Sequence, residues 1–306
     1  MRPPPTPRGL LHAARRLFRP VRTPRKRGLC GPSGAVEEKD RRRVEGGGGG
    51  ARHKRLQRLA LSGSGWLLPF HVGACHQLRE MGYIDENTEY AGASGGSLVA
   101  AAICCGFSHE EIMAHVLDLA CWYRNSPPSL GKLEAEMRGR FRDILPSDAP
   151  KRVEGRLHIS VLPIRPTNRF TQKLHRDFET TEDLIEAVLT SSYIPFYLGP
   201  YPAKYYRDEW CIDGGIGNAV PPFPGSLSVC PLPGTGVAAS RFHPARFIAS
   251  DVDITPDLLD FGHVAAIPGY PLLLRHALSP ARDEVLWRYY ECGVESAKEW
   301  STRCTT

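Results

Sequence analysis

The sequence has no apolar run long enough to cross a membrane. A membrane-spanning helix needs about 20 consecutive apolar residues. Even residues 98–107 form only a ten-residue run, and it contains a glycine. We therefore predict no transmembrane segment.

Cysteine pairs with metal-binding spacing are also absent. The nine cysteines are odd in number and show no C-x-x-C pattern, so neither a zinc site nor a disulfide framework is indicated. This usage favours reduced cysteines in an intracellular compartment. We expect no metal.

Acidic residues are missing from the first 36 positions, which contain nine Lys or Arg. Residues 1–55 hold 16 of the 39 basic residues but only four of the 33 acidic ones, so residues 56–306 have a net charge of −6. An acidic folded part argues against nucleic-acid binding.

The basic leader has one amphipathic stretch. Apolar residues fall on one helical face opposite Arg15, Arg16 and Arg19, as in mitochondrial presequences: Leu10, Leu11, Ala14, Leu17 and Phe18. Plastid transit peptides contain more serine. The alternative is a disordered basic tail, because the prolines at 3–5 and the glycines at 46–50 do not favour folding. We expect 1–55 to be a leader and 56–306 to form the domain.

Hydrophobic patterning in residues 56–306 predicts strands that alternate with helices. Residues 56–62 read as a strand, followed by a glycine turn and a helix that ends at Gly82. A second copy has a strand at 89–92 and a helix that ends at Gly106. Further strands are predicted at 157–164, 210–212 and 227–230, and helices after Ser108 and Thr180. This alternation predicts a three-layer α/β/α fold with a mostly parallel central sheet.

The segment Gly92-Ala93-Ser94-Gly95-Gly96 fits G-x-S-x-G. Glycines on both sides of the serine allow a sharp strand-to-helix turn that exposes the hydroxyl. A tight helix start that needs only small residues is the alternative. The predicted strand before it and helix after it favour a nucleophile elbow.

Gly63-Ser64-Gly65 begins a possible dinucleotide fingerprint, but Leu68 replaces the third glycine and no acidic residue ends a second strand. We therefore expect no cofactor. The other use of such a turn is to direct backbone N–H groups at a developing oxyanion.

Asp213-Gly214-Gly215 follows a predicted strand and reads by itself as a turn. Together with a serine elbow and a glycine turn, its carboxylate becomes a candidate base. The alternative is a Ser-Asp-His triad, because three histidines follow Asp213: His243, His263 and His276.

Four segments resemble the patatin-like phospholipase family over about residues 56–231: LALSGSGWLLPFHVGACHQL, YAGASGGSLVAA, GRLHISV and CIDGGIGNAVP. Residues 275–300, with YYECGVESAKEW, are similar to the closing helix of the shorter eukaryotic members, including the adipose triglyceride lipase group.

The resemblance implies a patatin-like fold and a catalytic dyad of Ser94, the nucleophile, and Asp213, the base. It also implies an oxyanion hole from the N–H groups of Gly63, Ser64 and Gly65. The sequence departs from the family at Leu68, where a glycine is usual, and lacks the basic residue that many members carry near Leu67. The implied activity is hydrolysis of glycerolipid fatty-acyl esters, of the triacylglycerol lipase or phospholipase A type, at a membrane or lipid-droplet surface.

A catalytically silent lipid-binding or regulatory protein of the same fold is the competing function, although the retention of both Ser94 and Asp213 argues against it. Triacylglycerol, phospholipid, lysophospholipid and galactolipid substrates all fit the motifs, because loop shape selects the head group. Transacylation and any oligomeric state fit equally. Apolar residues at 66–70 and 193–197 would suit an acyl chain or the lipid interface.

Overall fold

The computed structural model describes residues 55–126, 131–165, 171–233, 252–259 and 268–305, which belong to one compact unit, Lys54–Thr306. The predicted leader lies outside the described residues except for Arg55. His243 and His263, two of the three candidate triad histidines, also lie outside them.

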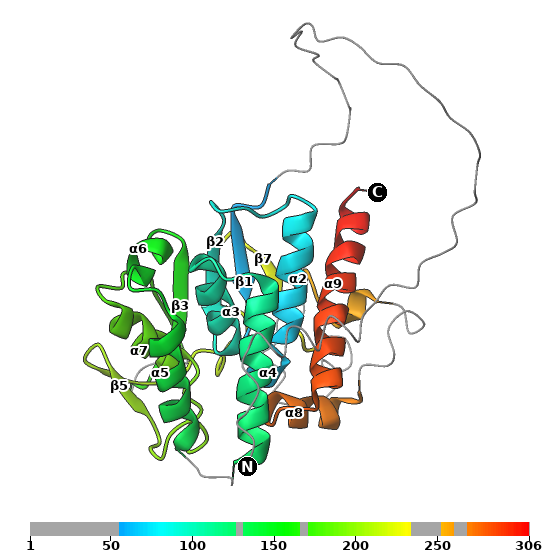
Figure 1. The fold of residues 1–306 in the computed structure, drawn as a ribbon. Helices are drawn as coiled ribbons and strands as arrows, with labels where there is room; N and C mark the ends of the chain where they lie inside the picture. The colour runs from blue at the N-terminus through cyan, green and yellow to red at the C-terminus, as the bar shows by residue number, and fades with distance from the viewer. Residues whose placement is uncertain (1–54, 127–130, 166–170, 234–251, 260–267, 306) are drawn as a thin grey trace, which may run out of the picture. The chain divides into compact units, whose positions relative to one another are not determined.

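The central sheet has the strand order β5-β6-β3-β2-β1-β7, and β4 also pairs with β3. Strands β7, β1, β2 and β3 are parallel to their neighbours in this series, whereas β4, β5 and β6 pair antiparallel (Figure 1). The strand bounds are β1 Arg58–Leu61, β2 Glu89–Ala93, β3 Leu157–Pro163, β4 Lys173–His175, β5 Lys204–Tyr206, β6 Glu209–Asp213 and β7 Leu227–Val229. The predicted α/β fold with a mostly parallel central sheet is confirmed.

The helices follow the strands much as predicted. Their bounds are η1 Gly65–Leu67, α2 Pro69–Glu80, α3 Gly95–Cys104, α4 His109–Asn125, α5 Lys132–Ile144, α6 Ala149–Val153, α7 Thr181–Ser191, η3 Pro256–Leu258, α8 Tyr270–Leu278 and α9 Asp283–Thr305. Gly106 ends the α3 segment with φ +92°, and Ser108 forms the expected capping box with Glu111. Within the part of the chain that the structure describes, no helix is both long and apolar enough to span a membrane.

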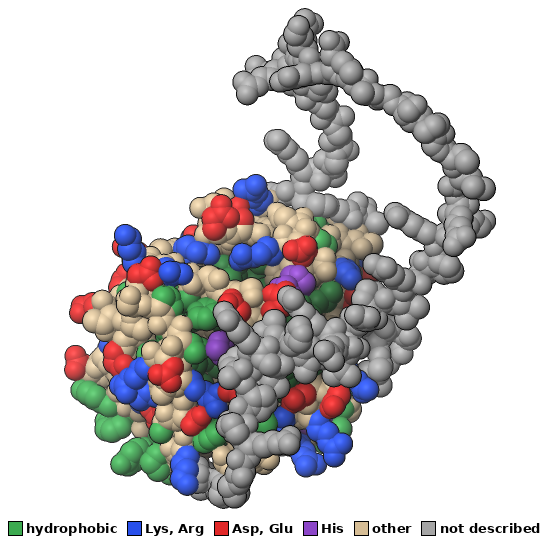
Figure 2. Space-filling model, viewed as in Figure 1, with side chains coloured by type: hydrophobic (Ala, Val, Ile, Leu, Met, Phe, Trp, Pro, Cys, Tyr) green, Lys and Arg blue, Asp and Glu red, His purple; other side chains and the backbone are tan. Residues whose placement is uncertain are grey.

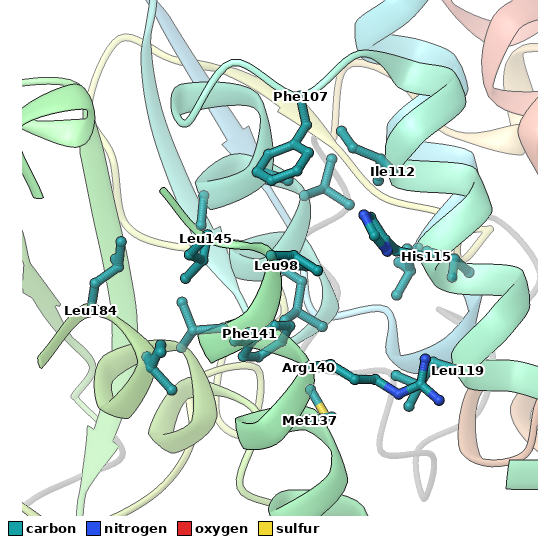
Figure 3. A pocket seen from close by; sticks show the side chains of 18 of the residues that line it. Leu98, Phe107, Ile112, His115, Leu119, Met137, Arg140, Phe141, Leu145 and Leu184 are labelled. Carbon is teal, nitrogen blue, oxygen red and sulfur yellow. The ribbon is translucent and has the colours of Figure 1, made fainter. Parts of the chain in front are cut away.

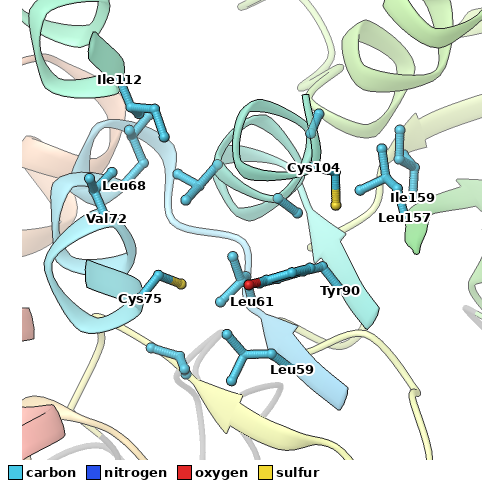
Figure 4. Close-up of a cluster of buried hydrophobic side chains, with 14 of the residues drawn as sticks. Leu59, Leu61, Leu68, Val72, Cys75, Tyr90, Cys104, Ile112, Leu157 and Ile159 are labelled. Carbon is cyan, nitrogen blue, oxygen red and sulfur yellow. The ribbon is translucent and has the colours of Figure 1, made fainter. Parts of the chain in front are cut away.

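The main core lies between the sheet and helices α2, α3 and α4 (Figure 4). The parallel register aligns Leu59, Tyr90 and Leu157 across β1, β2 and β3, and because side chains alternate in a strand they share one face. All three are fully buried. Burial of this apolar row fixes the register of the strands that lead to the site.

Helices α2 and α9 lie side by side at unusually close range (Figure 1). A Cβ atom at Gly73 would lie 2.0 Å from the Tyr290 carbonyl oxygen, and one at Gly293 would lie 2.0 Å from that of Phe70. Only glycine permits this approach, so Gly73 and Gly293 allow the backbones of α2 and α9 to touch. We call this contact the glycine clamp.

Candidate active site

Ser94 occupies a strained turn between β2 and α3, with φ +50° and ψ −125°. A Cβ atom at Gly92 would lie 2.5 Å from Ser97 Cα, and one at Gly96 would lie 2.5 Å from the Leu61 carbonyl oxygen. These positions need glycine because the backbone segments touch there. Ser94 is also the N-cap of α3, where the helix dipole stabilises negative charge. The strand–serine–helix context predicted for an elbow is present.

Asp213 ends β6 and is 3% exposed. Its Oδ1 accepts a hydrogen bond from the Gly215 N–H at 2.7 Å, whereas its buried Oδ2 has no hydrogen-bond partner among the described residues. Burial raises the pKa of Asp213 to about 6, and the neighbouring Ser94 hydroxyl and the Gly215 N–H act in the opposite direction. The carboxylate is therefore a stronger base than an ordinary aspartate, with one oxygen left to accept a proton.

An antiparallel strand brings Asp213 to the level of Ser94. On β3, Ser160 pairs with Ala93 of β2, and the next residue, Val161, pairs with Asp213 of β6. The Asp213 N–H then donates to the Tyr193 carbonyl oxygen at 2.9 Å. Sequence analysis predicted a strand before Asp213 but not the antiparallel direction of this strand.

The three glycine-containing motifs meet at one point. A Cβ atom at Gly63 would lie 3.1 Å from Gly215 Cα and 3.7 Å from Ser94 Cβ. A Cβ atom at Gly214 would lie only 2.0 Å from the Ser160 carbonyl oxygen. The structure thus brings together the serine, the aspartate and the first glycine turn, which are far apart in the sequence.

The predicted oxyanion donors differ in availability. The Gly63 N–H donates to the Ala219 carbonyl oxygen at 2.8 Å. No backbone carbonyl oxygen of the described parts of the chain accepts a hydrogen bond from the N–H groups of Ser64 and Gly65. A Cβ atom at Gly95 would lie 2.4 Å from Ser64 Oγ, so this turn touches the elbow. Two of the three predicted donors remain open beside Ser94, and Gly63 is already engaged.

Leu68, which replaces the third glycine of the G-x-G-x-x-G pattern, has an ordinary helical φ of −53°. Its side chain is 7% exposed and belongs to the main core. Leucine therefore causes no backbone strain here, and its contribution is packing.

His71 lies on α2, the helix that follows the glycine turn, and sequence analysis assigned it no role in the site. The ring is fully buried, and its Nε2 hydrogen-bonds the Ser62 carbonyl oxygen at 3.0 Å, directly before the glycine turn. Burial lowers the pKa of His71 to about 4, so the ring is neutral at neutral pH. His71 thus holds the residue that precedes Gly63-Ser64-Gly65, which we call the oxyanion turn.

Ser191 is a functional residue that sequence analysis missed. Its Oγ accepts a hydrogen bond from the Ser94 N–H at 2.9 Å and donates one to the Ser160 carbonyl oxygen at 2.6 Å. The signal in the sequence is the polar run at 190–192, which ends an otherwise apolar helix face. Ser191 connects the elbow to the strand that pairs with β6.

Of the three candidate triad histidines, only His276 lies among the described residues, and it has another partner. His276 lies on α8, and its Nδ1 hydrogen-bonds the Tyr289 hydroxyl at 2.8 Å. No histidine of the described segments forms a hydrogen bond with Ser94 or Asp213. The same segments contain no group of three or more His, Cys, Asp or Glu suited to a metal ion.

An apolar pocket of about 930 Å³, part of it open to solvent, lies between α3, α4, α5 and α7 (Figure 3). Trp66, which directly follows the glycine turn, and Leu98, one helical turn after Ser94, both line it. Its polar side chains are His115 and Arg140, and Arg140 is paired with Asp118 and Glu136. The pocket thus includes one residue that follows the glycine turn and one from the first turn of α3, whereas neither Ser94 nor Asp213 lines it.

Comparison with known proteins places the region of the three motifs in one family. The family model for patatin-like phospholipase matches residues 59–224. Human patatin-like phospholipase domain-containing protein 4 is 32% identical over 248 residues, which cover 78% of this chain and 93% of that protein.

Two longer relatives match over a smaller share of their length. Human patatin-like phospholipase domain-containing protein 5 is 31% identical over 56% of this chain and 43% of that protein. Mouse omega-hydroxyceramide transacylase is 30% identical over 53% of this chain and 28% of that protein. The chain thus spans less than half the length of these two relatives.

Proposed function

Because the chain belongs to the patatin-like phospholipase family, we propose that it is a serine acyl hydrolase that cleaves fatty-acyl esters of glycerolipids through Ser94 and Asp213. The observation that carries this proposal is the buried Oδ2 of Asp213, unpartnered in the described structure, beside a serine on a strained elbow. A serine hydroxyl is a weak nucleophile until a base within reach accepts its proton.

The proposed reaction has two steps. In the first, Asp213 Oδ2 takes the Ser94 proton as Oγ attacks the ester carbonyl, and the proton then passes to the departing alcohol oxygen, leaving an acyl-enzyme. In the second, Asp213 takes a proton from water, the hydroxide attacks the acyl carbonyl, and the proton returns to Ser94 as the fatty acid leaves. The open N–H groups of Ser64 and Gly65 and the N-terminus of α3 would stabilise the oxyanion in both steps.

The apolar pocket supports a fatty-acyl substrate. Its lining is almost entirely apolar, as in sites that bind apolar ligands. Two of its lining residues, Trp66 and Leu98, follow the glycine turn and Ser94 closely in sequence, and we propose that an acyl chain on Ser94 enters the pocket past them. Triacylglycerols and phospholipids, the two proposed classes, both carry such a chain.

The test is a panel of lipid esters assayed with the full chain, with a serine-reactive fluorophosphonate probe run alongside. Ser94→Ala and Asp213→Ala should each remove nearly all hydrolysis, a loss of about 10⁴-fold or more, and the double variant should be hardly worse. His276→Ala is the matched control, and its activity should stay within about tenfold, or ~1.4 kcal/mol of barrier.

Two outcomes would contradict the proposal. If His276→Ala loses as much activity as Ser94→Ala while it stays folded, a triad operates instead of the dyad. If the wild-type protein neither hydrolyses any ester nor takes the probe, the silent lipid-binding alternative holds. Acyl transfer to an added alcohol in the same panel would identify transacylation.

We also propose that residues 1–55 form a leader that targets the protein to an intracellular compartment, the mitochondrion or the plastid, and that 56–306 form the catalytic domain. The support is the acid-free, Arg-rich composition of the first 36 residues. A chain that lacks residues 1–55 should keep its specific activity and change its location in cells, as measured by assay and fluorescence microscopy. Loss of both folding and activity would contradict the proposal.

A further inference from the structure

Four large aromatic side chains are exposed at the β5–β6 edge of the molecule, and we call them the aromatic edge: Phe196, Tyr201, Tyr205 and Trp210. Each is more than half exposed, from 54% for Phe196 to 66% for Tyr201. Figure 2 shows hydrophobic side chains gathered at the lower left, over the region where Figure 1 places β5. Because these rings are clustered and not scattered, the edge is a candidate interaction surface.

The hairpin β5–β6 holds two of these rings in place. Tyr205 and Trp210 pair across the strands, with ring centroids 5.4 Å apart. The turn between the strands, Arg207 and Asp208, has φ +46° and +63°, and Arg207 is tied to Asp183 of α7 at 2.7 Å. A tight turn of this kind matches the twist of a hairpin. The rings are therefore displayed by an ordered support.

Phe196 is exposed at the cost of backbone strain. It has φ +61°, which non-glycine residues rarely adopt, and its N–H donates to the Tyr201 carbonyl oxygen at 3.3 Å. Strained non-glycine residues persist where the surrounding structure holds them, and they concentrate at functional positions. Here the strained residue presents a phenyl ring to the outside.

The segment that carries Phe196 is joined directly to the active site. Tyr193 accepts the Asp213 N–H through its carbonyl oxygen, and its hydroxyl hydrogen-bonds the backbone of Tyr201. Tyr197 accepts a hydrogen bond from Trp66 Nε1–H at 3.0 Å and donates one to the Leu278 carbonyl oxygen at 2.7 Å. Residues 193–197 therefore form hydrogen bonds with Asp213, with Trp66 next to the glycine turn and with Leu278 of α8.

Helix α8 adds two exposed apolar side chains. Leu272 is 43% exposed and Leu278 is 51% exposed. Tyr197, the neighbour of Phe196 in sequence, bonds to Leu278, so the chain segment that carries Phe196 also contacts α8. An enzyme that must take its substrate out of a lipid layer needs this placement.

We propose that the aromatic edge and the two leucines of α8 dock on a phospholipid surface and hold the active site against it. Tyrosine and tryptophan suit such an occupant, since their rings combine apolar area with a polar tip and favour the membrane–water interface. This inference rests on the proposed lipid substrate but names a surface that catalysis itself does not use.

Vesicle flotation of the full chain tests the docking surface, with vesicles of phosphatidylcholine and phosphatidylglycerol. Tyr205→Ser combined with Trp210→Ser should weaken binding roughly tenfold or more, because two half-exposed rings lose their burial in the interface. Trp210→Tyr should keep binding within about threefold, since tyrosine also favours the interface. The matched control is Glu295→Ser with Lys298→Ser, an equally exposed ion pair on α9, which should bind as the wild type does.

Hydrolysis of a short-chain ester below its micellar concentration separates this inference from the proposed function. The Tyr205/Trp210 double variant should hydrolyse the monomeric ester at the wild-type rate and lose rate only on vesicles. If the wild type is inactive on the ester yet the double variant loses vesicle binding, the enzymatic proposal fails and docking stands.

Two results would overturn the docking proposal. One is equal vesicle binding by the double variant and the wild type. The other is a wild-type protein that does not bind vesicles but is dimeric by light scattering and becomes monomeric in the double variant, which would make the aromatic edge an interface between two copies.

Discussion

The half of the site that carries Ser94 and the half that carries Asp213 are built in different ways. Ser94 follows β2 in the second of two successive strand–turn–helix units, and the glycines that shape its turn lie within two residues of it. Asp213 ends an antiparallel strand and is fixed by more distant groups, the carbonyl oxygens of Ser191 and Tyr193, which accept the N–H groups of Gly214 and Asp213.

The difference teaches that a nucleophile can be positioned by local backbone geometry, whereas its base depends on packing between remote segments. A substitution in the Asp213 half should therefore change stability and activity together. In the Ser94 half, the turn itself sets the geometry.

The largest effect is expected from Gly214→Ala. The new Cβ atom would lie 2.0 Å from the Ser160 carbonyl oxygen of β3, so β3 and the segment that follows Asp213 must move apart. We expect a loss of at least ~3 kcal/mol in the free energy of unfolding, measured with urea, and a matching loss of ester hydrolysis. Gly139→Ala in α5 is the control, because nothing lies within 4 Å of that Cβ and alanine should stabilise the helix by about 0.5–1 kcal/mol. A Gly214→Ala variant as stable as the wild type would show that the backbone around Gly214 can move to make room for a Cβ atom at no cost in stability.

A smaller effect is expected from Asp213→Asn, seen in the pH dependence of stability. The folded pKa of about 6 lies above the ordinary aspartate value of about 3.9. Between these values the native state binds more protons than the unfolded state, so the free energy of unfolding falls as pH rises. The asparagine variant should thus be more stable than the wild type by up to ~3 kcal/mol at pH 8 and about equal at pH 4, although inactive.

The pH dependence of the free energy of unfolding also tests His71, which lies in the Ser94 half. Its folded pKa of about 4 lies below the ordinary value of about 6.5, so its contribution to stability rises with pH over this window. The two groups oppose each other in the wild type, and Asp213→Asn should uncover the rising slope of His71. In the wild type, kcat/KM should increase with pH through about 6 as Asp213 ionises. Activity that is independent of pH from 4 to 8 would exclude Asp213 as the base.

The smallest effect is expected from Ser191→Ala, which removes the link between the two halves. The buried Ser94 N–H and the Ser160 carbonyl oxygen each lose a hydrogen bond, which should cost about 1–3 kcal/mol in thermal or urea unfolding and about tenfold in kcat. Ser192→Ala is a control one residue away, because the buried Ser192 Oγ has no hydrogen-bond partner in the described structure. It should change stability by no more than ~0.5 kcal/mol. Equal effects of the two substitutions would deny Ser191 a linking role.

The Ser94 half could be predicted almost completely from sequence, because its determinants are local. Strand, glycine turn and helix follow each other within a few residues, and the family recognised from these motifs is confirmed. The helix end at Gly106 and the helix start after Ser108 were also predicted correctly, since each depends on residues within one helical turn.

The Asp213 half was predictable only in part. Strand β6 pairs antiparallel with β3 at the residues that follow those paired with β2, and no local pattern encodes this direction or register. Helix α5 was not predicted, because it contains many charged residues and its apolar face is sparse. The roles of His71 and Ser191 arise from hydrogen bonds to residues that the fold brings near, so residue type alone did not reveal them.

The glycine clamp between α2 and α9 has a consequence for the timing of folding during synthesis. The helix that follows the oxyanion turn finds its closest helical neighbour in a segment that leaves the ribosome more than 200 residues later. At ~5–20 residues per second, that wait is on the order of tens of seconds. Until α9 emerges, the face of α2 around Gly73 has no cover, and we expect the nascent chain to depend on chaperones over that interval. The lipid-cleaving activity proposed for this protein would therefore begin only after nearly all of the chain described here has been made.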